Sequence, residues 1–217
     1  MRVHTPPPTP RLKSQWFRAG PAKSAEQQAS AMAFIVWRVA RHTLDRMRRA
    51  GFDVEVGTPY FAFLREVLVF LVAVTDRIAH ARLDAAQRLV FTAALAHHLA
   101  RILQDNEDDL LGPSAPGEPS HADTFIDLVN EVTSHYAEFG ADPSLPAGDA
   151  GFHPDFGFLR YLGRRLEPTL PEKDRRWVLD QVMAVEAPEA VAMVQRSMRD
   201  LFEPVARRPR RNGTTGD

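Results

Sequence analysis

Eight consecutive residues without a polar side-chain atom, Val67 to Val74, restrict the possible folds more than any other stretch of the chain. They lie in a segment that begins with Thr58 and Pro59, a pairing typical of an N-cap and a first helical residue, and that continues to about Arg82. A membrane span needs roughly 20 apolar residues, so this run is too short to be one. A helix that is apolar nearly all round is a central core helix, and we expect this role for residues 59–82.

Helix-start and helix-stop signals divide the rest of the chain into further helices joined by short connections. The pattern predicts helices over about 24–50, 84–111, 120–139, 155–167, 171–186 and 188–203. Ser24, Asp84 and Ser120 suit N-cap positions, and Pro171 and Pro188 suit the first turn of a helix. No stretch gives a convincing strand. The expected fold is therefore a single all-α, bundle-like domain of about seven helices.

The two ends of the chain differ in composition from the rest. Residues 1–23 are Pro-rich and basic, and residues 204–217 include the basic run "ARRPRR". We expect both to be disordered, with the folded domain covering residues 24–203. Because the N-terminus lacks the apolar region of a secretory signal and the chain has no cysteine, the expected location is the cytoplasm.

The net charge of −1 conceals a strong separation of charge along the chain. Residues 1–50 hold ten Lys or Arg and two acids, whereas residues 101–150 hold eleven acids and one base, Arg101. Asp105, Glu107, Asp108 and Asp109 stand near a predicted helix C-terminus, where the helix dipole disfavours negative charge. They are either a solvated face or a docking patch for a basic partner. We expect a protein partner or self-association through the acidic and basic surfaces. The basic tail is short and has no aromatic residue to stack on a base, so nucleic acid is not expected.

Carboxylates and imidazoles on the predicted helices raise a metal site as an alternative. Glu66, Asp76 and His80 fall within about 80° of one another on a helical wheel. Facing helices that carry such groups can bind iron, manganese or zinc. The remaining candidates are His98, Glu131 and His135. The usual di-iron signature, however, spaces Glu and His by three residues, whereas here the acid–His spacing is four, which also suits local ion pairs.

Motifs of phosphate-binding loops, nucleophile elbows and HExxH metalloproteases are absent from the sequence. The main hypothesis is therefore a non-enzymatic binding, regulatory or adaptor protein with no cofactor. A second alternative is a protein that binds a small apolar ligand between Phe61, Phe63, Phe70 and Phe91.

Two resemblances bear on the segment around the apolar run. "AGFDVEVGTPYFAFLREVLVFLVAV" resembles the turn and recognition helix of TetR-type repressors, which implies a TetR-like regulator. Those repressors have a short helix-turn-helix before the "AG", whereas here one long helix is expected, and "FDVEVGTPYFAF" has no basic residue to meet phosphate. The stretch from "FDVEVGTPYFAF" to "DRIAHARL", residues 52–83, resembles all-helical proteobacterial proteins of unassigned function, and this implies no activity.

Overall fold

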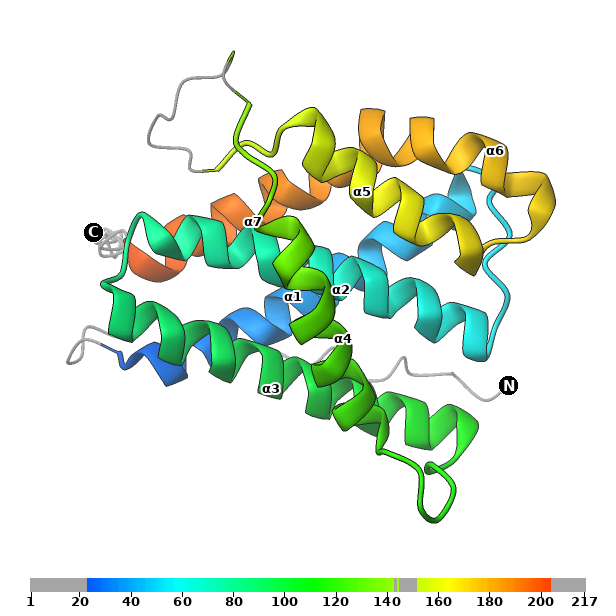
Figure 1. Cartoon of the computed structure of the whole chain (residues 1–217), viewed down its shortest axis with the longest axis horizontal. Helices are drawn as coiled ribbons and strands as arrows, with labels where there is room; N and C mark the ends of the chain where they lie inside the picture. Colours follow the sequence, from blue (N-terminus) through cyan, green and yellow to red (C-terminus); the bar gives the residue numbers. More distant parts are fainter. Residues whose placement is uncertain (1–22, 143, 145–151, 204–217) are drawn as a thin grey trace, which may run out of the picture.

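The computed structural model describes residues 23–142, 144 and 152–203, which form an all-α domain (Figure 1). Within these residues the regular secondary structure is helical, and the only β pairing is one isolated bridge between Ala141 and Pro154. Nearly all of the predicted N-terminal arm and the predicted C-terminal tail lie outside the described residues. The described part contains no helix that is long and apolar enough to cross a membrane.

The first five helices match the predicted ranges to within three residues at each end. They are α1 (Ala25–Arg49), α2 (Thr58–His80), α3 (Ala85–Leu111), α4 (His121–Tyr136) and α5 (Phe156–Leu166). A short 3-10 turn follows, η2 (Glu167–Thr169). The last part consists of α6 (Glu172–Gln181), the π-helical segment η3 (Val182–Glu186) and α7 (Ala187–Phe202).

Local side-chain bonds explain why these helices begin where they do. The Ser24 hydroxyl accepts from the Gln27 N–H, and the Gln27 side chain accepts from the Ser24 N–H, which completes a capping box. Asp84 and Ser120 each accept from a backbone N–H three residues later, at the starts of α3 and α4. These bonds satisfy helix N–H groups that would otherwise lack a partner.

The predicted break between residues 186 and 188 is wrong in one respect, because the backbone stays helical through it. Pro188 has no N–H to donate to the carbonyl four residues earlier. The chain accommodates it by a π turn, in which the Ala187 N–H donates to the carbonyl of Val182, five residues back. The turn also places Glu186 inside the domain, where its carboxylate accepts from Arg46 of α1 at 2.9 Å. α6, η3 and α7 are thus one continuous helical run, which leaves the described helix count close to the expected seven.

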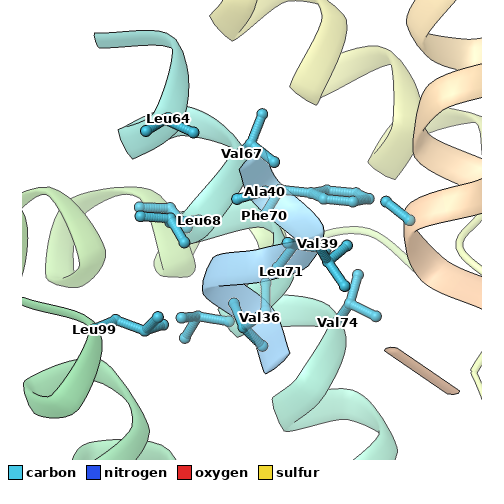
Figure 2. Close-up of a cluster of buried hydrophobic side chains, with 14 of the residues drawn as sticks. Val36, Val39, Ala40, Leu64, Val67, Leu68, Phe70, Leu71, Val74 and Leu99 are labelled. Atoms are coloured by element: carbon cyan, nitrogen blue, oxygen red, sulfur yellow. The ribbon is translucent and has the colours of Figure 1, made fainter. Parts of the chain in front are cut away.

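The central position predicted for the apolar helix is confirmed. Val67, Leu68, Leu71 and Val72 are fully buried, and α2 packs against α1, α3, α4, α5 and α7. In Figure 1, α2 runs back along α1, and the chain reverses again into α3. Figure 2 shows the α2 side chains meeting residues of α1, such as Val36 and Val39, and Leu99 of α3. The core is one continuous hydrophobic cluster, and α2 lies at its centre.

Candidate interaction surface

Glu66 of α2 is engaged by an arginine of α5. The Arg165 Nε and Nη2 atoms donate to the two Glu66 carboxylate oxygens at 2.8 and 2.7 Å, a bidentate pair across 99 positions of sequence. Burial raises the pKa of Glu66, although Arg165 lowers it. The pair joins α2 to α5, and Tyr136 and Tyr161 lie beside it.

Asp76 and His80 meet a single arginine on the other side of the α2–α3 turn. Asp76 accepts from the Arg88 Nε at 2.9 Å and from the Thr92 hydroxyl at 2.7 Å. The His80 Nδ1 lies 3.3 Å from the Arg88 Nη1, and His80 is exposed. His80 is therefore exposed at the end of α2, whereas Asp76 is partly buried against α3.

The six predicted metal ligands do not come together. His98 Nδ1 lies 2.5 Å from the Arg101 Nη2, while Glu131 and His135 are exposed on α4. Among the residues that the structure describes, no three His, Asp or Glu side chains form a group that could hold a metal ion. The physical reason is that Glu66 and Asp76, although they share a sector of the wheel, lie ten residues apart along α2 and therefore face different helices.

The four phenylalanines considered for an apolar ligand are packed into the core. Phe61, Phe63, Phe70 and Phe91 are all buried. Phe70 stacks edge-on against Tyr136 and Phe158, and Phe91 lies against Phe202 of α7. Their aromatic surface is thus covered by other side chains of the chain itself.

Glu107 requires a correction, because it does not belong to a solvated acidic face. It is 0% exposed. Its Oε2 accepts from the Arg65 Nη2 of α2 at 2.7 Å and lies 3.2 Å from the Nδ1 of His121 of α4. Sequence reasoning missed this role, although a signal was present: Glu107 continues the buried stripe of Leu99 and Leu103 at spacings of four.

The other acidic residues of this region lie at the surface. We define the acidic surface by five exposed carboxylates: Asp105, Asp109, Asp123, Asp127 and Glu131. The first two end α3. The last three step by four along α4, which packs against α3. Asp108, the fourth residue of the predicted patch, is half-buried and lies 3.7 Å from His121.

No lysine or arginine occurs between residues 102 and 142, so any basic side chain that neutralises the acidic surface must come from another part of the chain or from a partner. In the described part of the chain, no ion pair involves any residue of the acidic surface. Two arginines of α1 are engaged elsewhere. Arg46 binds Glu186 and Glu189, and Arg48 donates to the Val54 carbonyl. The separation of charge in the sequence is therefore not cancelled by ion pairs within the described fold.

Comparisons of this chain with protein-family models, with curated proteins and with solved structures found no match in any of the three.

Proposed function

We propose that the chain is a non-enzymatic binding protein, of regulatory or adaptor type, and that its acidic surface on α3 and α4 engages a basic segment of a protein partner. One contrast supports the proposal. The partly or fully buried carboxylates Glu66, Asp76, Glu107 and Glu186 each bind an arginine, whereas none of the five exposed carboxylates of the acidic surface forms an ion pair among the described residues. Glu131 acts on Arg165 only through a longer-range charge interaction, which helps to raise the Arg165 pKa.

Electrostatics favours this role over a contribution to stability. An exposed ion pair stabilises a fold by at most about 1 kcal/mol, and the five carboxylates form no such pair within the described part of the chain. The acidic surface therefore adds nothing to the stability of the fold. A surface of one sign raises the local concentration of oppositely charged partners and speeds their association. Binding of this kind weakens as salt is added, because the screening length falls below about 10 Å above 0.1 M salt.

The test is titration of the full chain with a fluorescent peptide that carries six Lys or Arg residues. We expect binding at 50 mM salt that weakens by an order of magnitude or more at 300 mM salt. A triple variant, Asp123→Asn, Asp127→Asn and Glu131→Gln, should weaken binding at 50 mM by about tenfold.

The matched control neutralises three exposed acids on other helices, Asp45, Glu172 and Asp200, with the same change in net charge. It should retain most of the binding. Equal losses in both triple variants would contradict a localised surface, and the absence of salt-sensitive binding would contradict the proposal as a whole. Light scattering over the same salt range separates self-association from binding to a different protein.

A further inference from the structure

A second surface lies at the junction of α1, α6 and η3, away from the acidic surface; in Figure 1, α6 lies at the upper edge of the view and α3 at the lower edge. It is an open groove of about 450 Å³. Its lining includes Phe52, Trp177, Ala184, Val185, Asp174 and Asp180. These residues come from the turn after α1, from α6 and from the π segment, so the continuous α6–η3–α7 run shapes the groove.

The groove exposes apolar surface that the fold does not cover. Trp177 is 56% exposed, although the Arg176 guanidinium lies 4.9 Å from the centre of its ring, and Val185 is also exposed. Exposed tryptophans of this kind are typical anchors of binding surfaces. The lining holds two carboxylates, Asp174 and Asp180, and no lysine or arginine.

We propose that this groove binds the chain's own N-terminal segment, residues 5–11, with the sequence "TPPPTPR". Aromatic-lined grooves bind Pro-rich segments because proline restricts the backbone to the polyproline II conformation, so little conformational entropy is lost on docking. Prolines 6, 7, 8 and 10 would pack on Trp177, Phe52 and Val185. Arg11 would meet Asp174 or Asp180, which explains the sign of the charge in the groove.

The length of the intervening chain permits docking within one molecule. α1 spans Ala25–Arg49, about 36 Å at 1.5 Å per residue, and the groove begins at its C-terminal end. The twelve residues from Arg11 to Lys23 reach about 40 Å when extended. Because the residues between Arg11 and Lys23 must be nearly extended to pass along α1, the contacts in the groove and not the tether supply the binding free energy. The groove shares no residue with the acidic surface, so a failure of N-terminal docking would leave the proposed binding of a basic partner untouched, and the reverse.

The first test measures proximity in the full chain. Because the chain has no cysteine, Thr9→Cys introduces a single site for a nitroxide label. We expect the label to broaden the indole N–H signal of Trp177 in the NMR spectrum. The Trp177→Phe variant, which lacks this signal, assigns it. Replacing Pro7, Pro8 and Pro10 with glycine should remove most of this broadening. Equal broadening in the proline and glycine forms would show random sampling by the tether and overturn the proposal. Mixing labelled chain with isotope-enriched unlabelled chain must give no broadening; if it does, docking occurs between copies and the intramolecular proposal is wrong.

The second test uses limited trypsin digestion of the full chain after Arg11 and Lys13. Docking protects these bonds from trypsin. When docking and undocking are fast relative to cleavage, the cleavage rate is proportional to the fraction of undocked chains. Trp177→Ala should raise the cleavage rate about fivefold. Phe156→Ala is the matched control, because Phe156 is a similarly exposed aromatic (67%) outside the groove, and it should leave the rate unchanged. An unchanged rate in Trp177→Ala, or an equal rise in both variants, would overturn the proposal.

Discussion

Replacing Leu71 with alanine tests whether α2 is the centre of the core. The Leu71 side chain is 0% exposed and lies in the stretch of α2 that meets α1 (Figure 2). Removing most of a buried leucine side chain costs the lost transfer energy plus the energy of the cavity that remains, about 2–5 kcal/mol in all. Because other helices pack around α2, the surroundings have little freedom to collapse into that cavity. We therefore expect a loss of about 3–4 kcal/mol.

The assay is urea unfolding followed by circular dichroism, with the slope m compared between variants so that a change in midpoint reports stability alone. For a domain of this size, each kcal/mol lowers the melting temperature by about 2–4 °C, which predicts a decrease of about 10 °C. The matched control is Leu89→Ala on α3, where the same atoms are removed from a side chain that is 72% exposed. It should change stability by less than about 0.5 kcal/mol. A loss below about 1 kcal/mol for Leu71→Ala, or equal losses at the two sites, would refute the central role of α2.

Two further predictions concern a buried carboxyl and a helix contact. Burial raises the pKa of Glu107, although Arg65 and His121 lower it. The folded chain therefore retains this proton at a pH where the unfolded chain has released it, and the carboxyl destabilises the fold as the pH rises above the ordinary value of 4.5. Urea unfolding at several pH values should show that the stability of Glu107→Gln relative to the wild type rises as the pH increases above 4.5, until Glu107 is ionised; a constant or falling difference would contradict this. A Cβ at Gly163 would lie 2.5 Å from Leu179 Cδ1, so we expect Gly163→Ala to cost about 1–2 kcal/mol in the wild type. In a Leu179→Ala background it should instead stabilise by about 1 kcal/mol through helix propensity, and a double-mutant cycle without this change of sign would reject the contact.

Features that depend on neighbours in sequence could be predicted from the sequence itself. The Ser24 capping box and the Asp84 and Ser120 caps join residues three positions apart, so the starts of α1, α3 and α4 are local properties. The burial of Val67 to Val74 follows from composition alone, because a helix without a polar side requires neighbours all round. The exposed stripe of Asp123, Asp127 and Glu131 follows from helical periodicity.

Tertiary structure alone decided the partners of the charged residues. Glu66 meets Arg165 across 99 positions, and Glu107 meets Arg65 across 42, so these pairs exist only once α2 has packed against α5 and α3. The same packing turned two metal candidates, Glu66 and Asp76, toward arginines of other helices, whereas His98 meets Arg101 one turn further along its own helix. It also made the groove beside Trp177, which joins the end of α1 to η3. Helical periodicity places a side chain on a face, but only the crossing of the helices determines which residue that face meets.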